Sequence, residues 1–446
     1  MACDEFKGST LSLTQAIKTL CAFFTVGVML SGCDKVFEKQ TAPAEVAQPE
    51  IKVNYDQVLS SANLFVYSQL SDTLSKAQAL DSVVTSLLHH PNPLSLEEAQ
   101  KAWVETYNAY LQAAFFYRVP RFEKPRYHEE QQTYAALREQ IDSWPIEGGY
   151  IDYLPMYPLS GIVNDLTLKI TLPSLMTQHG FSDRSFASIG FHPLEFMLFG
   201  PNGQRSARDF IPQENSVETV SIDVKQNSPE AVAEGDSDQE EKHEDEDGHN
   251  HDAVLPQGPQ NHNRRREYLR ILSAHLVASL QQLNDRWDPA HGYYAKQWHQ
   301  PDARLNLSRV YQAAVDTIET DILSEHIMVL LTSESMDERR SAFSGQDLAN
   351  IQAMLAGVNN LFTIENGIIG EIKSLNAEVA DKMMAELQRS TRDLSVLKES
   401  MITDTLAKRK AAFSPIQQRL VSLLESLYLG AEVLGIELKA LPVSTS

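Results

Sequence analysis

Apolar residues recur at three- and four-residue spacing along most of the chain, which is the pattern of helices with one buried face. The first such stretch begins near residue 53, and its apolar positions include Leu59, Ala62, Phe65, Val66 and Leu70. The same spacing predicts further helices over residues 95–115, 127–141, 264–287, 303–331, 346–362, 371–397 and 415–437. No segment alternates convincingly between apolar and polar residues, so no strand is expected. The pattern predicts an all-α fold of two antiparallel, bundle-like halves.

Local signals indicate how some of these helices begin. Ser95 to Glu98 has the sequence of a capping box at the start of the second helix. Pro415 is expected in the first turn of the last helix, after Ser414. Residues 144–161 are too rich in Gly, Pro and aromatic residues for a regular element. We expect them to form a long packed loop, and ordered loops of this length often carry function.

The negative charge of the chain is concentrated in one segment. The 446 residues hold 38 Lys and Arg against 60 Asp and Glu, a formal net charge of −22. Residues 213–262 hold 14 of these acids and only 2 Lys, a local charge of −12. Such a composition is typical of a disordered insert between two folded halves. Because no basic stripe occurs elsewhere, nucleic-acid binding is not expected.

The acidic segment also contains histidines. His243, His249 and His251 lie among its acids, and His262 follows them. Imidazoles and carboxylates on one adaptable segment chelate transition metals weakly. Weak metal capture by these four histidines is therefore a hypothesis, and a solvated acidic segment without ligand chemistry is the alternative.

The first residues predict export and a lipid anchor. Lys18 precedes an apolar run, Leu20–Leu30, that is too short to cross a membrane and is typical of a secretory signal peptide. The run ends in Leu30-Ser31-Gly32-Cys33, which resembles a bacterial lipobox. This resemblance implies cleavage before Cys33, a lipid on its thiol and a location in the bacterial periplasm, and Asp34 favours the inner membrane. A buried N-terminal helix that ends by chance in Gly-Cys is the alternative.

These signals divide the chain into five parts. We predict a signal peptide over 1–32, a tether over 33–52, a first helical half over 53–212, the insert over 213–262 and a second helical half over 263–446. All three cysteines (Cys3, Cys21 and Cys33) fall in or next to the signal peptide. The mature protein therefore has no disulfide and no cysteine ligand or nucleophile.

The sharpest chemical motif is Gly190-Phe191-His192-Pro193-Leu194-Glu195. Pro193 favours a first helical turn, so His192 is expected at the cap and Glu195 one turn away on the same side. The residues after Glu195 are apolar, so its carboxylate is expected to be buried and to need a partner. The pair could share a metal ion or act as an acid–base pair. The structural alternative is that Glu195 only caps its helix.

At this motif the sequence resembles the imelysin family of bacterial exported proteins, whose hallmark is G-x-H-x-x-E. Residues 144–153, 264–289 and 343–360 resemble further family segments in the same order. The resemblance implies an all-helical fold of two bundle-like halves with the motif near their interface. It also implies that His192 and Glu195 are functional, with Gly190 as part of the motif.

Imelysin-family members include iron-regulated exported proteins, components of iron uptake and proteins described as insulin-cleaving peptidases. The sequence lacks the common protease motifs H-E-x-x-H and G-x-S-x-G, and Phe196 stands where H-x-x-E-H needs a histidine. Metal binding without turnover is therefore favoured. Glu147 and Asp152 are the next candidate ligands, and oxygen donors with one imidazole suit iron. Helix capping or pairing with Arg118 or Arg121 is the alternative for these two acids.

We therefore predict a lipid-anchored periplasmic protein that binds a divalent or ferric ion, with iron favoured, for uptake or homeostasis. The expected partners are the membrane, through Cys33, and an iron-uptake membrane transporter. One alternative is a metallopeptidase in which Glu195 acts on a zinc-bound water. Another is a non-catalytic interaction module in which the motif is only structural.

Overall fold

The computed structural model describes residues 52–119, 133–213, 261–298, 302–335 and 339–439. Within these ranges the chain forms helices joined by turns and loops, and no strand occurs apart from a single bridge between Leu154 and Tyr157. The predicted all-α fold is confirmed. No helix in these ranges is long and apolar enough to cross a membrane.

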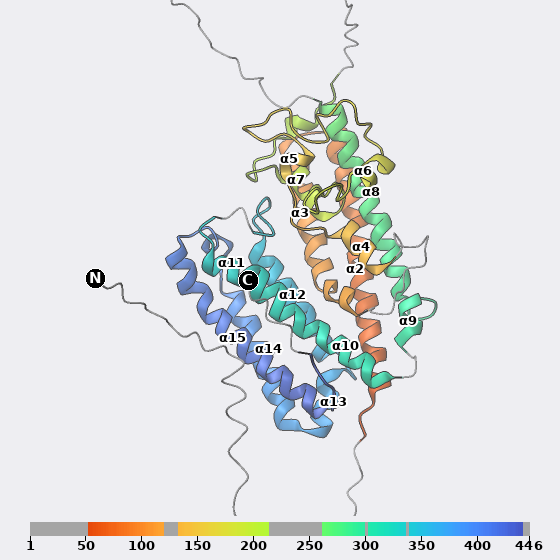
Figure 1. Cartoon of the computed structure of the whole chain (residues 1–446), viewed down its shortest axis with the longest axis vertical. Helices are drawn as coiled ribbons and strands as arrows, with labels where there is room; N and C mark the ends of the chain where they lie inside the picture. Colours follow the sequence, from red (N-terminus) through yellow and green to blue (C-terminus); the bar gives the residue numbers. More distant parts are fainter. Residues whose placement is uncertain (1–51, 120–132, 214–260, 299–301, 336–338, 440–446) are drawn as a thin grey trace, which may run out of the picture. The chain divides into compact units, whose positions relative to one another are not determined.

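Three long helices form the framework of the segment before residue 288 (Figure 1): α2 (Tyr55–His89), α3 (Pro93–Leu111) and α8 (His262–Trp287). Helix α2 packs against both of the others. The other helices of this segment are short: η1 (Ala114–Arg118), α4 (Tyr134–Ile141), α5 (Gly148–Ile151), α6 (Leu172–Gln178), α7 (Phe191–Phe199) and η3 (Ala207–Phe210). The short helix α9 (Tyr293–Trp298) follows α8.

The helices after residue 302 form a second group. They are α10 (Ala303–Asp316), a π-helical stretch η4 (Thr317–Ile327), α11 (Met328–Thr332), α12 (Asp347–Thr363), α13 (Ile368–Leu375), α14 (Ala377–Ser395), η5 (Glu399–Met401) and α15 (Leu406–Val433). Helix α12 contacts α14 and η4 within this group and α3 of the first group. At the α3 contact, a side chain on Gly357 would collide with the backbone carbonyl of Gln112, so glycine permits the close approach.

Two predicted helix starts are wrong. Helix α3 begins at Pro93, and the capping box pairs Asn92 with Ser95 instead of Ser95 with Glu98. Asparagine caps a helix as well as serine does, and proline suits the first helical position, so the stronger signal lay upstream. Helix α15 begins at Leu406, so Pro415 lies inside it instead of in its first turn.

Three other predicted helices differ in continuity. The helix expected over 371–397 is divided at Asn376, whose side chain accepts a hydrogen bond from the Val379 N–H and starts α14. The helix expected over 303–331 is continuous but π-helical in its middle, η4. The helix expected over 127–141 is described only from Tyr134 onward. Residues 144–161 are irregular as predicted, except for the four-residue α5.

Candidate functional site

Helix α7 carries the G-x-H-x-x-E motif and is buried along its whole length. Glycines flank it at both ends, Gly190 with φ +103° and ψ −170° and Gly200 with φ +75° and ψ +178°. These backbone conformations are nearly exclusive to glycine. A Cβ on Gly190 would also lie 2.7 Å from the carbonyl oxygen of Ile141, so glycine lets α7 begin directly against the end of α4. The side chain of Arg205 donates to the carbonyls of the last turn of α7, which satisfies them inside the core.

His192 and Glu195 lie one turn apart on the same side of α7, as predicted. His192 is the second residue of the helix, so the prediction that it would be the cap is wrong; the cap is Gly190. The His192 Nδ1 atom is 2.9 Å from Oε2 of Glu195, and neither side chain is exposed to solvent. The backbone N–H of Ser344 donates to Oε1 of Glu195 over 2.9 Å. The buried carboxylate thus has two partners.

Three further side chains complete a buried cluster around the other edge of the imidazole. Oδ1 of Asp142 is 3.3 Å and the Tyr107 hydroxyl is 3.2 Å from His192 Nε2. The Tyr107 hydroxyl also donates to Asp142 Oδ1 over 3.1 Å. The Arg340 guanidinium donates to Asp142 Oδ2 over 2.8 Å and to the Tyr107 oxygen over 3.3 Å. We call Tyr107, Asp142, His192, Glu195 and Arg340 the His192 network.

The network joins segments that are far apart in the chain. Tyr107 comes from α3, Asp142 caps the end of α4, and His192 and Glu195 lie on α7. Arg340 precedes α12 and also pairs with Glu325 of η4 over 3.2 Å. The indole of Trp144 lies against the imidazole, with ring centroids 4.8 Å apart. Residues from both sides of the acidic segment therefore meet at His192.

The charges in the network support one another. Burial disfavours a charged imidazole, but hydrogen bonds to Asp142 and Glu195 outweigh it and raise the pKa of His192. Burial similarly opposes the charge on Asp142, yet the Arg340 guanidinium and His192 hold its pKa below the usual range. The Asp142 carboxylate in turn raises the pKa of Arg340, against the effect of burial. Basic and acidic side chains thus alternate in the order Arg340, Asp142, His192 and Glu195.

The other two predicted ligands do not join the network. Glu147 is exposed at the N-terminal cap position of α5 and makes no capping hydrogen bond through its side chain. Asp152 is fully buried, and its carboxylate binds the guanidinium groups of Arg265 and Arg205. Pairing with Arg118 or Arg121 was the predicted alternative for this acid, but Arg118 pairs with Asp321 instead, and Arg121 lies outside the described residues. Asp152 thus anchors its loop to α8.

The histidines of the acidic segment are described only at its end. His262 is the first residue of α8, and its Nδ1 is 3.0 Å from the carbonyl oxygen of Ile211. His243, His249 and His251 lie outside the described residues. Cys33, the predicted lipidation site, lies outside them as well.

The arrangement restricts how a metal could bind. Glu195 faces Nδ1 of His192 and Asp142 faces Nε2, so the two carboxylates lie at different edges of one imidazole. One ion on the ring therefore reaches one of them at a time. In the part of the chain that the structure describes, no group of three or more His, Cys, Asp or Glu is arranged to hold a metal ion.

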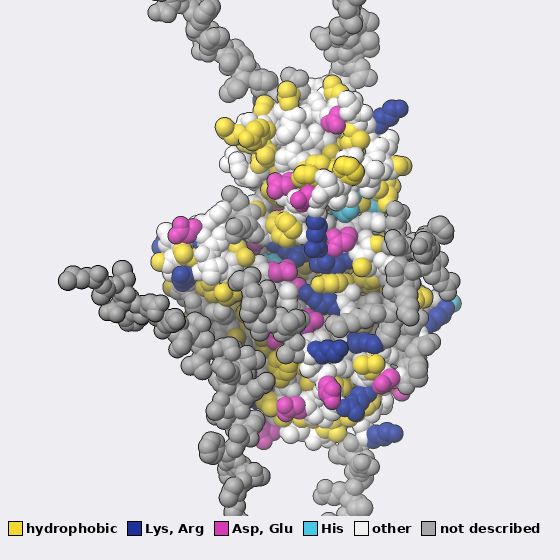
Figure 2. Space-filling view, viewed as in Figure 1, with side chains coloured by type: hydrophobic (Ala, Val, Ile, Leu, Met, Phe, Trp, Pro, Cys, Tyr) yellow, Lys and Arg dark blue, Asp and Glu magenta, His cyan; other side chains and the backbone are white. Residues whose placement is uncertain are grey.

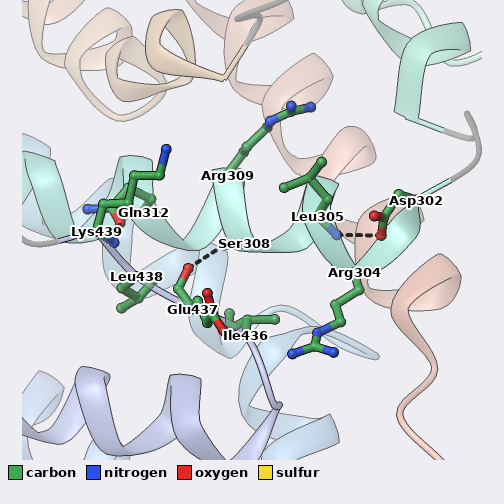
Figure 3. A pocket seen from close by; sticks show the side chains of 10 residues that line it. All are labelled: Asp302, Arg304, Leu305, Ser308, Arg309, Gln312, Ile436, Glu437, Leu438 and Lys439. Carbon is green, nitrogen blue, oxygen red and sulfur yellow. Dashed lines mark hydrogen bonds between the residues drawn. The ribbon is translucent and has the colours of Figure 1, made fainter.

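The larger described grooves lie away from the network. One with a volume of about 480 Å³ runs between α10 and the segment after α15 (Figure 3). Its walls include Arg304, Arg309 and Lys439, and Arg304 and Arg309 point in different directions. No residue of the His192 network lines it. A small cavity touches the network at one member, since Arg340 lines it together with Glu325, His326 and Asp347. The other four members of the network are buried away from the described cavities.

Comparison with known proteins identifies the family. The sequence profile of Imelysin (Peptidase_M75) matches residues 66–427, which is most of the chain. The chain belongs to the imelysin family. No curated protein matched this chain.

Solved imelysin-type structures share this fold. A Parabacteroides distasonis protein named iron-regulated protein A precursor is 13% identical, with a TM-score of 0.58, over 86% of this chain and 97% of that one. An imelysin-like protein of Psychrobacter arcticum is 15% identical, with a TM-score of 0.57, over 87% of this chain and 99% of that one. At these identities the likeness shows the imelysin fold alone.

Sequence reasoning missed three members of the network of this imelysin: Asp142, Arg340 and the hydroxyl of Tyr107. A weak signal existed for each. Asp142 lies two residues before the loop over 144–161, and Arg340 lies three residues before the family-like segment that begins at Phe343. Tyr107 stands among the apolar positions of its helix, where a hydroxyl needs a partner.

The charge of His192 predicts how stability depends on pH. Its pKa is raised in the folded protein, so its contribution is complete below the unfolded value of about 6.5 and is lost as the pH rises through the folded value. The wild type should have a higher free energy of unfolding than His192→Gln, and we expect this difference to be larger at pH 6 than at pH 9. Urea unfolding of both proteins at the two pH values measures this. A His192 proton resonance that titrates below pH 6.5 would contradict it.

Proposed function

We propose that this protein is a lipid-anchored periplasmic imelysin that binds a metal ion, with iron favoured, for uptake or homeostasis. The observation that carries the proposal is the pair formed by His192 Nδ1 and Glu195, 2.9 Å apart on one turn of a buried helix. Family membership and the fold shared with a protein named for iron regulation support it.

The donor types of the network fit iron. One imidazole with a carboxylate oxygen is a donor pair that iron binds, whereas the soft thiolates that select copper(I) are absent from residues 34–446. His192 and Glu195 would hold the ion, and bound there it would act as a positive charge between nitrogen and oxygen donors. Hydrogen bonds to Asp142 and Glu195 raise the pKa of His192, so protons compete with a metal ion for this ring. Further donors are needed beyond these two residues, since the described residues group no third one with them.

A peptidase is less well supported by the same geometry. His192 and Glu195 have no solvent-exposed surface. Both oxygens of the Glu195 carboxylate are engaged, one by His192 and the other by the Ser344 N–H. A peptide bond therefore has no path to Glu195 without separation of these segments. An interaction module remains the alternative in which the network serves only to join its segments.

The anchor and the partner belong to the proposal. The lipobox-like end at Cys33 supports attachment to a membrane, and the Pro-containing segment 34–52 is long enough for a tether. An inner-membrane transporter for iron is the partner that this location favours.

Calorimetry tests the metal site directly. The soluble protein that starts after Cys33 is titrated with Fe(II) under anaerobic conditions and, separately, with Fe(III)-citrate. We expect tight binding that disappears in the His192→Ala/Glu195→Ala double variant. Loss of one imidazole and one carboxylate should weaken binding by at least about 100-fold.

Two controls separate the motif from other histidines. His275 is a buried histidine of α8 that lies outside the network, so His275→Ala should bind iron like the wild type. A protein without residues 213–262 should also keep the tight site. Binding that vanishes only with this deletion would instead assign the metal to the acidic segment.

A further inference from the structure

One loop of the first group exposes an unusual number of large apolar side chains. Met156 is 83%, Tyr157 67%, Leu159 66% and Leu166 72% exposed, all within eleven residues. On the face shown in Figure 2, hydrophobic side chains gather over the region where α5 and α7 lie in Figure 1. Clustered exposed apolar residues, unlike single ones, mark interaction surfaces. We call these four residues the 156–166 patch.

The backbone beneath the 156–166 patch is held in place at many points. Leu154 and Tyr157 exchange two backbone hydrogen bonds, and the Ser160 hydroxyl donates to the Tyr157 carbonyl. The Arg264 guanidinium binds four carbonyls of this loop, those of Ile162, Val163, Asp165 and Leu168. An apolar surface that is already ordered loses little conformational entropy when a partner binds.

Strong negative charge is attached at the same place. The acidic segment leaves the described structure at Gln213 and re-enters at Asn261. The Asn261 side chain donates to Asn164, two residues from Leu166, and the Gln213 backbone donates to Asn263 of α8. Both described ends of the segment 213–262, whose sequence carries a charge of −12, therefore lie where α8 begins, next to the loop that holds the patch. The patch itself consists only of described residues, and its exposed neighbour Asp165 is acidic too.

An ordered apolar patch together with an acidic segment favours one kind of partner. An anionic lipid surface would be repelled by the negative charge of the segment whose ends lie there, and two copies of this chain would repel each other in the same way. A basic protein surface would be attracted, which raises the rate of association, and its apolar recess would cover the exposed side chains. We propose that the 156–166 patch docks a protein that presents an apolar recess bordered by Lys and Arg. This docking is independent of metal binding at His192.

Site-specific photocrosslinking tests the docking surface. The full-length protein is produced in its own cells with p-benzoylphenylalanine in place of Tyr157, and adducts are identified by mass spectrometry. We expect one protein partner, with crosslinked peptides next to Lys- or Arg-rich segments. Met156→Asp/Leu159→Asp in the same background should reduce the adduct about tenfold, because about 1.4 kcal/mol of lost affinity corresponds to that factor.

The controls decide between this partner and the others. Val396 is an apolar residue with 68% exposure outside the patch, so Val396→Asp should leave the adduct unchanged. With the purified pair, raising the salt concentration from about 0.05 to about 0.5 M should reduce crosslinking, since screening weakens the attraction. Adducts with lipid, with a second copy or with the protein's own acidic segment would overturn the proposal. So would the absence of any adduct, or one that the double variant leaves intact.

Discussion

Arg340→Met is expected to lower the free energy of unfolding by about 3–5 kcal/mol, because it leaves a buried carboxylate without its cation. Arg340 donates to Asp142 over 2.8 Å and to the Tyr107 hydroxyl over 3.3 Å, and its side chain is only 10% exposed. Methionine fills similar space but supplies no donor. Asp142 would then depend on the His192 imidazolium and the Tyr107 hydroxyl alone. Urea unfolding of the soluble protein measures the loss.

A surface arginine provides the comparison. Arg389 pairs with Glu386 over 2.6 Å, but its side chain is 53% exposed, so Arg389→Met should cost no more than about 0.5 kcal/mol. The double variant Arg340→Met/Asp142→Leu should be more stable than the sum of the two single losses predicts, since it removes both charges. If Arg340→Met cost no more than Arg389→Met, the network would be unimportant for stability.

The position of Arg340 shows where sequence reasoning ends. It is 198 residues from Asp142, and no periodicity or motif relates the two. Their pairing arises only because α3 crosses α12 and α7 begins at the end of α4. The family resemblance led to the segment that begins at Phe343, and Ser344 in that segment donates to Glu195. It did not indicate which neighbouring side chain holds Asp142.

Local patterns predicted the elements better than their ends. The spacing of Leu59, Ala62, Phe65, Val66 and Leu70 predicted the first helix, because one buried face leaves a regular trace in the sequence. Helix starts depend on single side chains, and the cap of α3 is Asn92 where Ser95 was predicted. The π-helical stretch η4 was not predicted, because the apolar spacing over 303–331 is that of an ordinary helix.

The sequence predicted the pairing within the motif but not the partners of the nearby acid Asp152. Burial of Glu195 and its pairing with His192 follow from apolar neighbours and three-residue spacing, and both are present. Asp152 was a candidate ligand because a carboxylate in an aromatic loop needs a partner. Its partners are Arg205 and Arg265, the latter 113 residues away. The chemistry of an isolated acid is therefore decided by tertiary contacts, which the sequence alone does not show.

Gly190→Ala is expected to destabilise the protein by about 3–5 kcal/mol, from backbone strain and a steric clash together. Alanine rarely adopts the backbone angles of Gly190, φ +103° and ψ −170°. Its Cβ would also lie 2.7 Å from the Ile141 oxygen and 2.8 Å from the Gln140 oxygen, both of which belong to backbone and cannot rotate away. Helix α7 must therefore move away from the end of α4, where Asp142 lies.

The pKa of His192 shows whether Gly190→Ala moves α7 or only lowers the stability of the protein. As His192 leaves Asp142, its pKa should fall from the raised value toward about 6.5, which proton NMR of the folded variant measures. Gly370 is the matched control, since it lies inside α13 and a Cβ there would meet nothing within 4 Å. Gly370→Ala should stabilise the protein by up to about 1 kcal/mol. A Gly190→Ala variant that keeps both its stability and the raised pKa of His192 would show that the motif does not need glycine for the placement of α7.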